Sequence, residues 1–296
     1  MMQCDLHVHS IHSGRCTTPF LGYLCRESYS GPQEVYHCLK RQGMSLVTLT
    51  DHDSIDGAEE LRRYPDFFAS EEVTCTMPSG TTIHINVYDL AERQHLEIQR
   101  RRDDLVALLA YLGEQRLFFS LNHIFSSLTG RRRAEDFDWL EAYFPAVEAR
   151  NGHLLRANNG YAAQLARQKG KVRLGGSDAH TLASVGSTYT VVPGARSKEE
   201  FLEGLRRGKG RVRGECGSYW KLTRDAFLVT QELMRERPWT LLLAPLAAGI
   251  PIVTLLNYFQ EVAFARRWGS RVSPRRGASV RTTLWPARSA SGEASA

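Results

Sequence analysis

The sequence predicts an α/β barrel, in which strands and helices alternate along residues 2–210. Short apolar runs alternate with amphipathic, helix-like segments, the pattern typical of parallel βαβ units. Histidines and acids lie at the ends of most of these runs, and barrels carry their chemistry at the C-terminal ends of strands. No glycine-rich phosphate loop is present, and the polar residues do not gather at one switch point. These observations favour a closed or nearly closed barrel over a doubly wound open sheet.

Each predicted strand is a short apolar run with a polar end. The runs are residues 67–73, 82–88, 117–123 and 146–151, together with those that lead into the polar clusters at 5–9, 50–53 and 176–180. Most of the ten histidines lie at or near the end of such a run, which a scattered population of surface histidines would not do.

Helical periodicity fills the intervals between these runs. The segment Gln33 to Gln42 starts after Pro32, a favoured first helical residue, and stops at Gly43. The segment Gln94 to Gln115 repeats leucine at helical spacing, so we expect one long amphipathic helix there. Further helices are expected over residues 55–63, 135–143, 154–169 and 198–207.

The polar clusters have the composition of a metal site. Strand residues two apart point to the same face, so His7 and His9 are directed at one point. Asp178 and His180 have the same spacing. Imidazole nitrogens and carboxylate oxygens that converge in this way suit Zn, Mn or Fe. A single such histidine would more often be a buried residue bonded to the backbone, but the whole set predicts a metallohydrolase.

These motifs resemble those of the PHP family, the polymerase and histidinol phosphatase domain. Its first motif resembles Asp5-Leu6-His7-Val8-His9-Ser10, and its second resembles Thr50-Asp51-His52-Asp53-Ser54 with Asp56-Gly57. His123 stands where the third motif has its histidine. The last motif resembles Gly176-Ser177-Asp178-Ala179-His180, followed by Val185-Gly186. The resemblance covers residues 2–210 in motif order, and the motifs are specific when taken together.

The resemblance implies a distorted (β/α)7 TIM-like barrel that binds two or three divalent metal ions (Mn, Zn or Fe) and hydrolyses phosphoesters. Carried over position by position, it assigns the first metal to His7, His9, Glu72 and Asp178, and a second metal to Glu72, as a bridge, with His84 and His123. His52 and His180 would hold a third metal, or position the phosphate if two bind. The family draws another third-site ligand from the loop after the first motif, where His12 is the candidate.

The chain departs from the family pattern around this loop and at the bridging acid. Residues 15–30 look like an insertion over the site, which we expect to affect substrate specificity. Glu71 competes with Glu72 for the bridging role, and Val73 favours Glu72.

Other polar residues have candidate roles in catalysis. Asp53 or His180 could pass a proton to the leaving oxygen. Arg15 and Arg150 are candidate phosphate contacts, although each is more often a solvated charge. Asp5 either orients a ligand histidine or caps a strand.

The cysteines and the distribution of charge indicate where the protein is located and which partners it binds. The six cysteines form no CxxC pair and no signal peptide precedes the first motif, so we expect a cytoplasmic enzyme with reduced thiols. The net charge of +6 belongs to residues 262–296, which hold seven Arg and one Glu, and the rest of the chain is neutral. No stable nucleic-acid partner is therefore indicated.

The C-terminal part differs in composition from the rest. Residues 238–260 hold no charge and are long enough to span a bilayer. A single span would place the basic tail outside, so a re-entrant or interfacial segment on an anionic inner membrane face fits better. A soluble helical pair packed on protein is the alternative. We expect residues 1–217 to form the barrel, 218–265 a helical hydrophobic segment and 266–296 a basic disordered tail.

The sequence thus predicts hydrolysis of a phosphorylated small metabolite or a nucleotide by a metal-activated hydroxide. Two alternatives stay open: another metal-assisted hydrolysis on a similar barrel, and a non-catalytic PHP-like module that binds or anchors.

Overall fold

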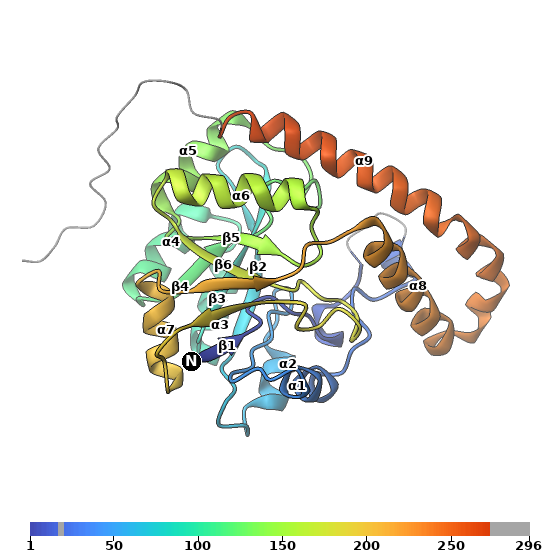
Figure 1. Ribbon diagram of the computed structural model, residues 1–296, viewed down its shortest axis with the longest axis horizontal. Coiled ribbons are helices and arrows are strands. Elements are labelled where there is room, and N and C mark those ends of the chain that lie inside the picture. The colour runs from blue at the N-terminus through green and yellow to red at the C-terminus, as the bar shows by residue number, and fades with distance from the viewer. Residues whose placement is uncertain (17–20, 273–296) are drawn as a thin grey trace, which may run out of the picture.

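Eight strands form two separate sheets in the computed structural model, which describes residues 1–16 and 21–272 (Figure 1). The smaller sheet has the order β1-β7-β8, from Met2–Cys4, Thr188–Val192 and Arg211–Gly214. The larger sheet runs β2-β3-β4-β5-β6 in chain order, from Ser70–Thr76, Thr82–Tyr88, Phe118–Leu121, Ala146–Asn151 and Val172–Gly176.

The mixed α/β class is confirmed, but the strands of the described residues do not form a closed barrel. Only β4-β5-β6 pair in parallel, and every other ladder in the described chain is antiparallel. Between the two sheets the chain makes single bridges, such as Val8 with Ala179, in place of ladders. Polar side chains take the ladder positions there: Thr50 Oγ1 accepts the Val8 N–H at 2.9 Å, and Asp51 Oδ1 accepts the Ser10 N–H at 2.6 Å. Backbone groups that form hydrogen bonds with side chains need no partner on a neighbouring strand, so the two sheets do not join into a closed barrel.

Most helices lie where the sequence predicts them. They are α1 (Pro32–Arg41), α2 (Asp56–Leu61), α5 (Ala134–Tyr143), α6 (Arg156–Gln168) and α7 (Lys198–Arg206), with short 3-10 turns η1 (Ile11–Ser13) and η2 (Leu21–Tyr23).

The expected single helix over 94–115 is two helices, α3 (Glu92–Arg101) and α4 (Leu105–Glu114). The Asp104 carboxylate accepts the N–H groups of Val106 and Ala107 at 3.0 and 3.1 Å. This N-cap starts a new helix, which leucine spacing alone did not reveal.

Apolar residues adjacent to the polar motifs build the core. Val8 lies between His7 and His9, and Val73 follows Glu72; both valines are fully buried in the main apolar cluster. Because side chains alternate along extended chain, the valines fix one face in the core and direct the motif side chains to the other. The core therefore aims the polar residues at one point.

Three helical segments follow the sheets: α8 (Tyr219–Glu236), the 3-10 helix η3 (Pro238–Gly249) and α9 (Ile250–Gly269). α8 projects from the body of the molecule, and α9 returns to lie near α5 and α6 (Figure 1). Trp268 of α9 stacks on Phe137 of α5 with ring centroids 5.6 Å apart. Residues 266–269, the start of the expected tail, are thus helical; 273–296 lie outside the described residues.

Candidate metal centre

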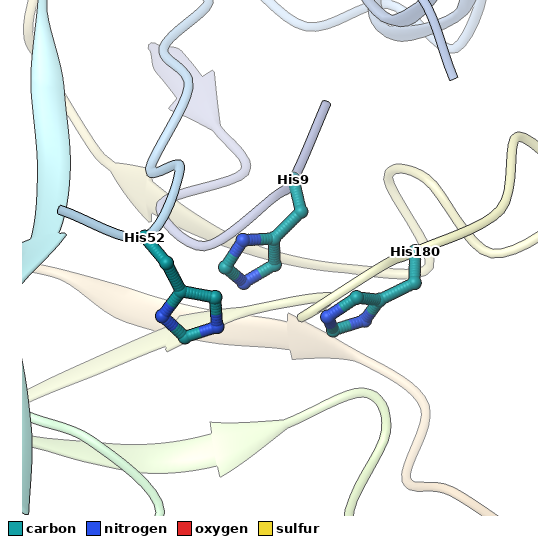
Figure 2. Close-up of side chains that lie close together, drawn as sticks. All are labelled: His9, His52 and His180. Carbon is teal, nitrogen blue, oxygen red and sulfur yellow. The ribbon is translucent and has the colours of Figure 1, made fainter. Parts of the chain in front are cut away.

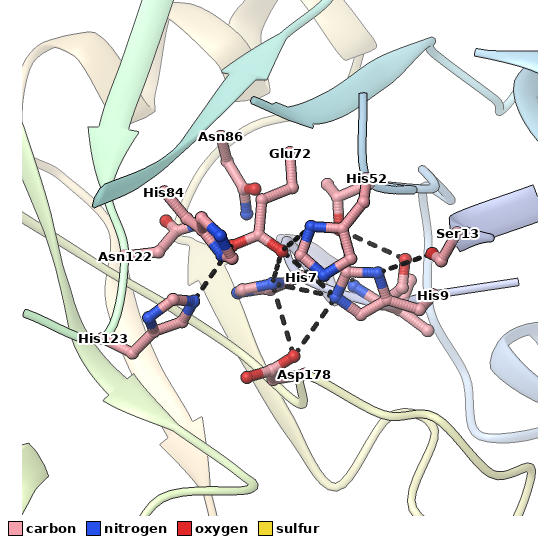
Figure 3. A network of polar contacts seen from close by, with 12 residues as sticks. His7, His9, Ser13, His52, Glu72, His84, Asn86, Asn122, His123 and Asp178 are labelled. Carbon is pink, nitrogen blue, oxygen red and sulfur yellow. Dashed lines mark hydrogen bonds and ion pairs between the residues drawn. The ribbon is translucent and has the colours of Figure 1, made fainter. Parts of the chain in front are cut away.

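All eight side chains that the sequence predicts as metal ligands lie in one cluster; Figure 2 shows His180 beside His9 and His52, and Figure 3 shows the other seven. They follow strands or stand in them: His7 and His9 after β1, Glu72 in β2, His84 in β3, His123 after β4, Asp178 and His180 after β6, and His52 on the segment that bridges to β2. Five of them are buried, and His52, His84 and His180 are partly buried, so the group forms one enclosed polar cluster.

Four of these side chains form a first subsite, in which His7 and His9 each lie close to Glu72 and to Asp178. His7 Nε2 lies 3.1 Å from both His9 Nε2 and Glu72 Oε2, and 3.4 Å from Asp178 Oδ1. His9 Nε2 lies 3.4 Å from Glu72 Oε2 and 3.2 Å from Asp178 Oδ1. Tetrahedral ligands at about 2.0–2.1 Å from a zinc-sized ion stand roughly 3.3 Å apart. The donor types and their spacing therefore fit a divalent metal.

The other oxygen of Glu72 faces a second group. Glu72 Oε1 lies 3.0 Å from His123 Nε2 and 3.4 Å from His84 Nδ1, and it accepts a 2.8 Å hydrogen bond from Asn122 Nδ2. One carboxylate thus serves both subsites, as a bridging ligand would.

A third group lies beside the first (Figure 2). The rings of His52 and His180 both stack on His9, with centroids 4.8 and 4.5 Å away. Glu27 completes this group: its Oε2 lies 3.5 Å from His52 Nε2, and its Oε1 lies 3.5 Å from His180 Nε2. Two imidazoles and a carboxylate form a set that could hold another cation.

Glu27 takes the place expected for His12. His12 Nε2 instead pairs with Glu60 Oε1 at 2.8 Å, outside the cluster. Sequence reasoning missed Glu27 because it lies in the 15–30 insertion, where no motif fixes the register. One feature of the sequence could have identified it: Glu27 is the single acid in residues 15–30, the loop expected to lie over the site.

Hydrogen bonds behind the cluster orient its side chains. Glu148 Oε1 lies 2.8 Å from His7 Nδ1, which leaves Nε2 free to face the cluster. Ser13 Oγ lies 2.9 Å from His9 Nδ1. Asn151 Nδ2 donates to Asp178 Oδ2 at 2.8 Å and to Glu148 at 2.9 Å. Each first-group ligand is therefore held by a second polar residue.

Backbone geometry brings the first and last motifs together. Asp5 accepts the N–H groups of His7, Ser177 and Gly186, so it orients the backbone of these segments. A Cβ on Gly176 would lie 2.3 Å from the His7 nitrogen, so only glycine allows this approach. Asp178 itself adopts φ 50°, a conformation that such tightly held sites sustain.

The pKa values of the residues in the cluster depend strongly on one another's charge. Burial opposes ionisation of Glu72, but His7, His52 and His84 outweigh it and hold the Glu72 pKa well below its usual range. Burial and the neighbouring His180 lower the pKa of His9 to about 3, which leaves its ring neutral. An ionised carboxylate beside a neutral imidazole is the protonation state that metal ligation requires.

Two of the three residues predicted to act in catalysis lie outside this cluster. Asp53 is engaged by Thr74, whose N–H donates to Oδ1 at 2.8 Å, and by Arg102, 2.5 Å from Oδ2. Arg15 is exposed, and its backbone pairs with Arg26. Only His180 of the three joins the centre.

Arg150 and Glu71, two other polar residues considered from the sequence, contact groups outside the cluster. The Arg150 guanidinium donates to the Gly214 carbonyl at 2.9 Å. Glu71 pairs with His95 Nδ1 at 2.8 Å, so Glu72 alone of the two acids faces the centre. His153 was not singled out from the sequence, yet its ring lies 5.9 Å from that of His180.

Comparison with known proteins agrees with this fold. Residues 156–209 match the model of the family described as PHP-associated. No curated protein sequence matches the chain.

Two solved structures share the fold. A two-domain protein from Bacteroides vulgatus, which contains a predicted PHP-like metal-dependent phosphoesterase, is 20% identical with a TM-score of 0.56, over 76% of this chain and 69% of that one. PsfC from Pseudomonas syringae is 18% identical with a TM-score of 0.55, over 79% of this chain and 98% of that one. The chain thus has the fold of these proteins, and its residues 156–209 match the PHP-associated family.

Proposed function

We propose that this protein is a metal-dependent phosphoester hydrolase. The observation that carries the proposal is Glu72, whose two oxygens face two separate groups of histidines at 3.0–3.4 Å. A carboxylate shared in this way is the usual bridge of a site that binds two metals close together.

Divalent metals held here would polarise a phosphoryl oxygen and lower the pKa of a nucleophilic water. The protein's own part is to hold the ligands in fixed positions. Glu148, Ser13 and Asn151 do so through the contacts to His7, His9 and Asp178 described above. Preorganised donors of this kind need no rearrangement as charge develops during the reaction.

Glu27, His52 and His180 give the centre its third group, and we propose that they hold a third cation beside the first two. Burial opposes protonation of His52, but Glu72 and Glu27 outweigh it and raise its pKa to about 10. A metal bound here would have to displace this proton, because a ligand imidazole must be neutral.

The substrate class we propose is a phosphorylated small metabolite or a nucleotide. The 15–30 insertion contributes Glu27 to the third group, so this loop adjoins the centre. A loop in that position limits the size of the group that can reach the metals.

The proposal is tested by metal content and phosphate release. Protein purified without chelator should hold two or three metal equivalents, and His7→Ala or Asp178→Ala should lower phosphate release by several orders of magnitude. His12→Ala is the matched control, because His12 pairs with Glu60 outside the centre. Less than one equivalent after resupply with Mn, Zn and Fe would overturn the proposal.

A further inference from the structure

The C-terminal helices carry most of the exposed apolar side chains of the described chain. Between residues 220 and 259 large apolar residues are repeatedly open to solvent, and Leu242 of η3 reaches 83% exposure. The segment Pro238–Gly269 is apolar and long enough to cross a membrane, yet only 11% of its most apolar stretch is buried. A core helix of a soluble protein with this composition would be mostly buried. The segment is therefore not explained by packing within the chain.

One stripe of α9 changes from apolar to basic along its length. Ile252, Leu256, Phe259, Ala263 and Arg267 follow at spacings of four and three, so they share a face. All five are exposed, Leu256 at 65% and Phe259 at 61%. An apolar half and a basic half thus point the same way.

The opposite face of α9 is turned toward protein and includes its only acid. Glu261 is buried; it accepts the Ser127 N–H and an Asn158 Nδ2 bond, each at 2.8 Å. Thr254 and Trp268 are buried on the same side. A water-facing helix would reverse this arrangement, with its acid outward and its leucines inward. The outward face has the composition of a surface that contacts a medium other than water.

Charge on the outward face is basic throughout. Residues 238–272 hold no acid besides the buried Glu261, while Arg266, Arg267 and Arg271 are exposed. Beside them lies a pocket of about 550 Å³ lined in part by Arg131, Arg267 and Gln260. This charge is complementary to anionic headgroups and repels a second basic copy of itself.

Both ends of the helical segment are fixed to the same body. At the start, Gly217 bridges to Leu155, and Asp225 of α8 accepts a 2.5 Å hydrogen bond from Ser184. At the end, Glu261 and Trp268 pack as described above. A segment held at both ends can enter a bilayer only from one side, so α9 cannot cross it without losing these contacts.

We propose that the outward face of η3 and α9 is a docking surface for an anionic lipid bilayer, on which α9 lies in the interfacial plane. The apolar half enters the boundary between headgroups and acyl chains, and the arginines contact lipid phosphates. The surface is separate from the metal centre, so this association does not depend on hydrolysis.

The test is flotation of the full chain with vesicles of phosphatidylcholine alone and of phosphatidylcholine mixed with phosphatidylglycerol. The protein should bind the mixed vesicles far more tightly. Changing Arg266 and Arg267 to Ala should weaken this binding about thirtyfold, since each basic residue contributes roughly 1 kcal/mol at an anionic surface. Changing Leu256 and Phe259 to Gln should abolish binding that resists high salt. Val106→Gln, at an exposed apolar site on α4, is the matched control.

A second measurement needs no variant. Brominated lipids should quench the tryptophan fluorescence of the wild-type chain, because Trp239 lies exposed in η3. Equal binding to both vesicle types, wild-type binding by the Gln variant, or no quenching would each overturn the proposal. A lipid-free dimer that the Gln variant converts to monomer would also overturn it, in favour of a second copy of this chain.

Discussion

A single buried carboxylate, Glu72, connects the three groups of the centre. Its two oxygens contact His7, His9 and His52 on one side and His84 and His123 on the other. Removal of such a charge would leave several imidazoles facing one another without compensation. The same reasoning makes Glu27 the residue on which the third group depends.

Glu27→Gln should reduce the metal content by about one equivalent and the phosphate release by roughly 10–100-fold, the range typical of weakened metal sites. The neutral amide keeps the shape of the side chain but loses the charge between His52 and His180. Elemental analysis and a phosphate assay measure both effects. Glu60→Gln is the control, since Glu60 pairs with His12 instead. Unchanged metal content in Glu27→Gln would exclude Glu27 as a ligand.

Asp53→Asn should alter stability and not the chemistry. Asp53 accepts the Thr74 N–H and pairs with Arg102, so we expect a loss of about 1 kcal/mol in the free energy of unfolding. Urea unfolding measures that loss, and the pH profile of phosphate release should be unchanged. Loss of the basic limb of this profile, where a proton donor would become deprotonated, would restore Asp53 as the proton donor.

At the scale of elements, the insertion and α8 act on the centre together. The insertion supplies Glu27, and its Arg26 pairs with Glu236 of α8 at 2.8 Å. Asp225 of α8 also binds Ser184, close after the last motif. α8 therefore positions two loops that carry or adjoin the metal ligands.

Glu261→Ala should release the end of α9 from the body. It removes the acceptor for Ser127 and Asn158 and leaves buried donors unpaired, so we expect a loss of about 2–3 kcal/mol in stability. Glu232→Ala is the control, because its i,i+3 pair with Arg235 is exposed and should contribute less than about 0.5 kcal/mol. Equal unfolding midpoints for the two variants would show that α9 is not held by this contact.

At the scale of the whole molecule, the C-terminal helices are part of the folded body. Trp268 and Val272 belong to the same apolar cluster as the residues behind the metal motifs, and Phe264 packs against it. A boundary after residue 217 would cut through this cluster. The helices thus combine an inner face that completes the core with an outer face that stays open.

Truncation after Gly217 should destabilise the protein and lower its metal content, since it removes Trp268 from the core and Asp225 from the loop after the last motif. Changing Leu242 and Leu246 to Gln in the full chain should leave both properties intact, because these side chains are exposed. Thermal unfolding and elemental analysis compare the two variants. A stable, metal-loaded truncated protein would instead support an independent domain that ends near residue 217.

The sequence by itself determined which side chains are candidate metal ligands and where most of the helices and strands lie. His7 and His9, or Asp178 and His180, are placed by local alternation, and helices such as α1 by local periodicity and end signals. Tertiary structure decided the rest: that Glu27 and not His12 joins the centre, that Glu72 faces inward while Glu71 binds His95, and that the sheets stay open. These outcomes depend on partners far apart in the chain. Local periodicity specifies the face of a helix or strand on which a residue lies. Only hydrogen bonds and charge pairs between distant parts of the chain specify which residues that face contacts.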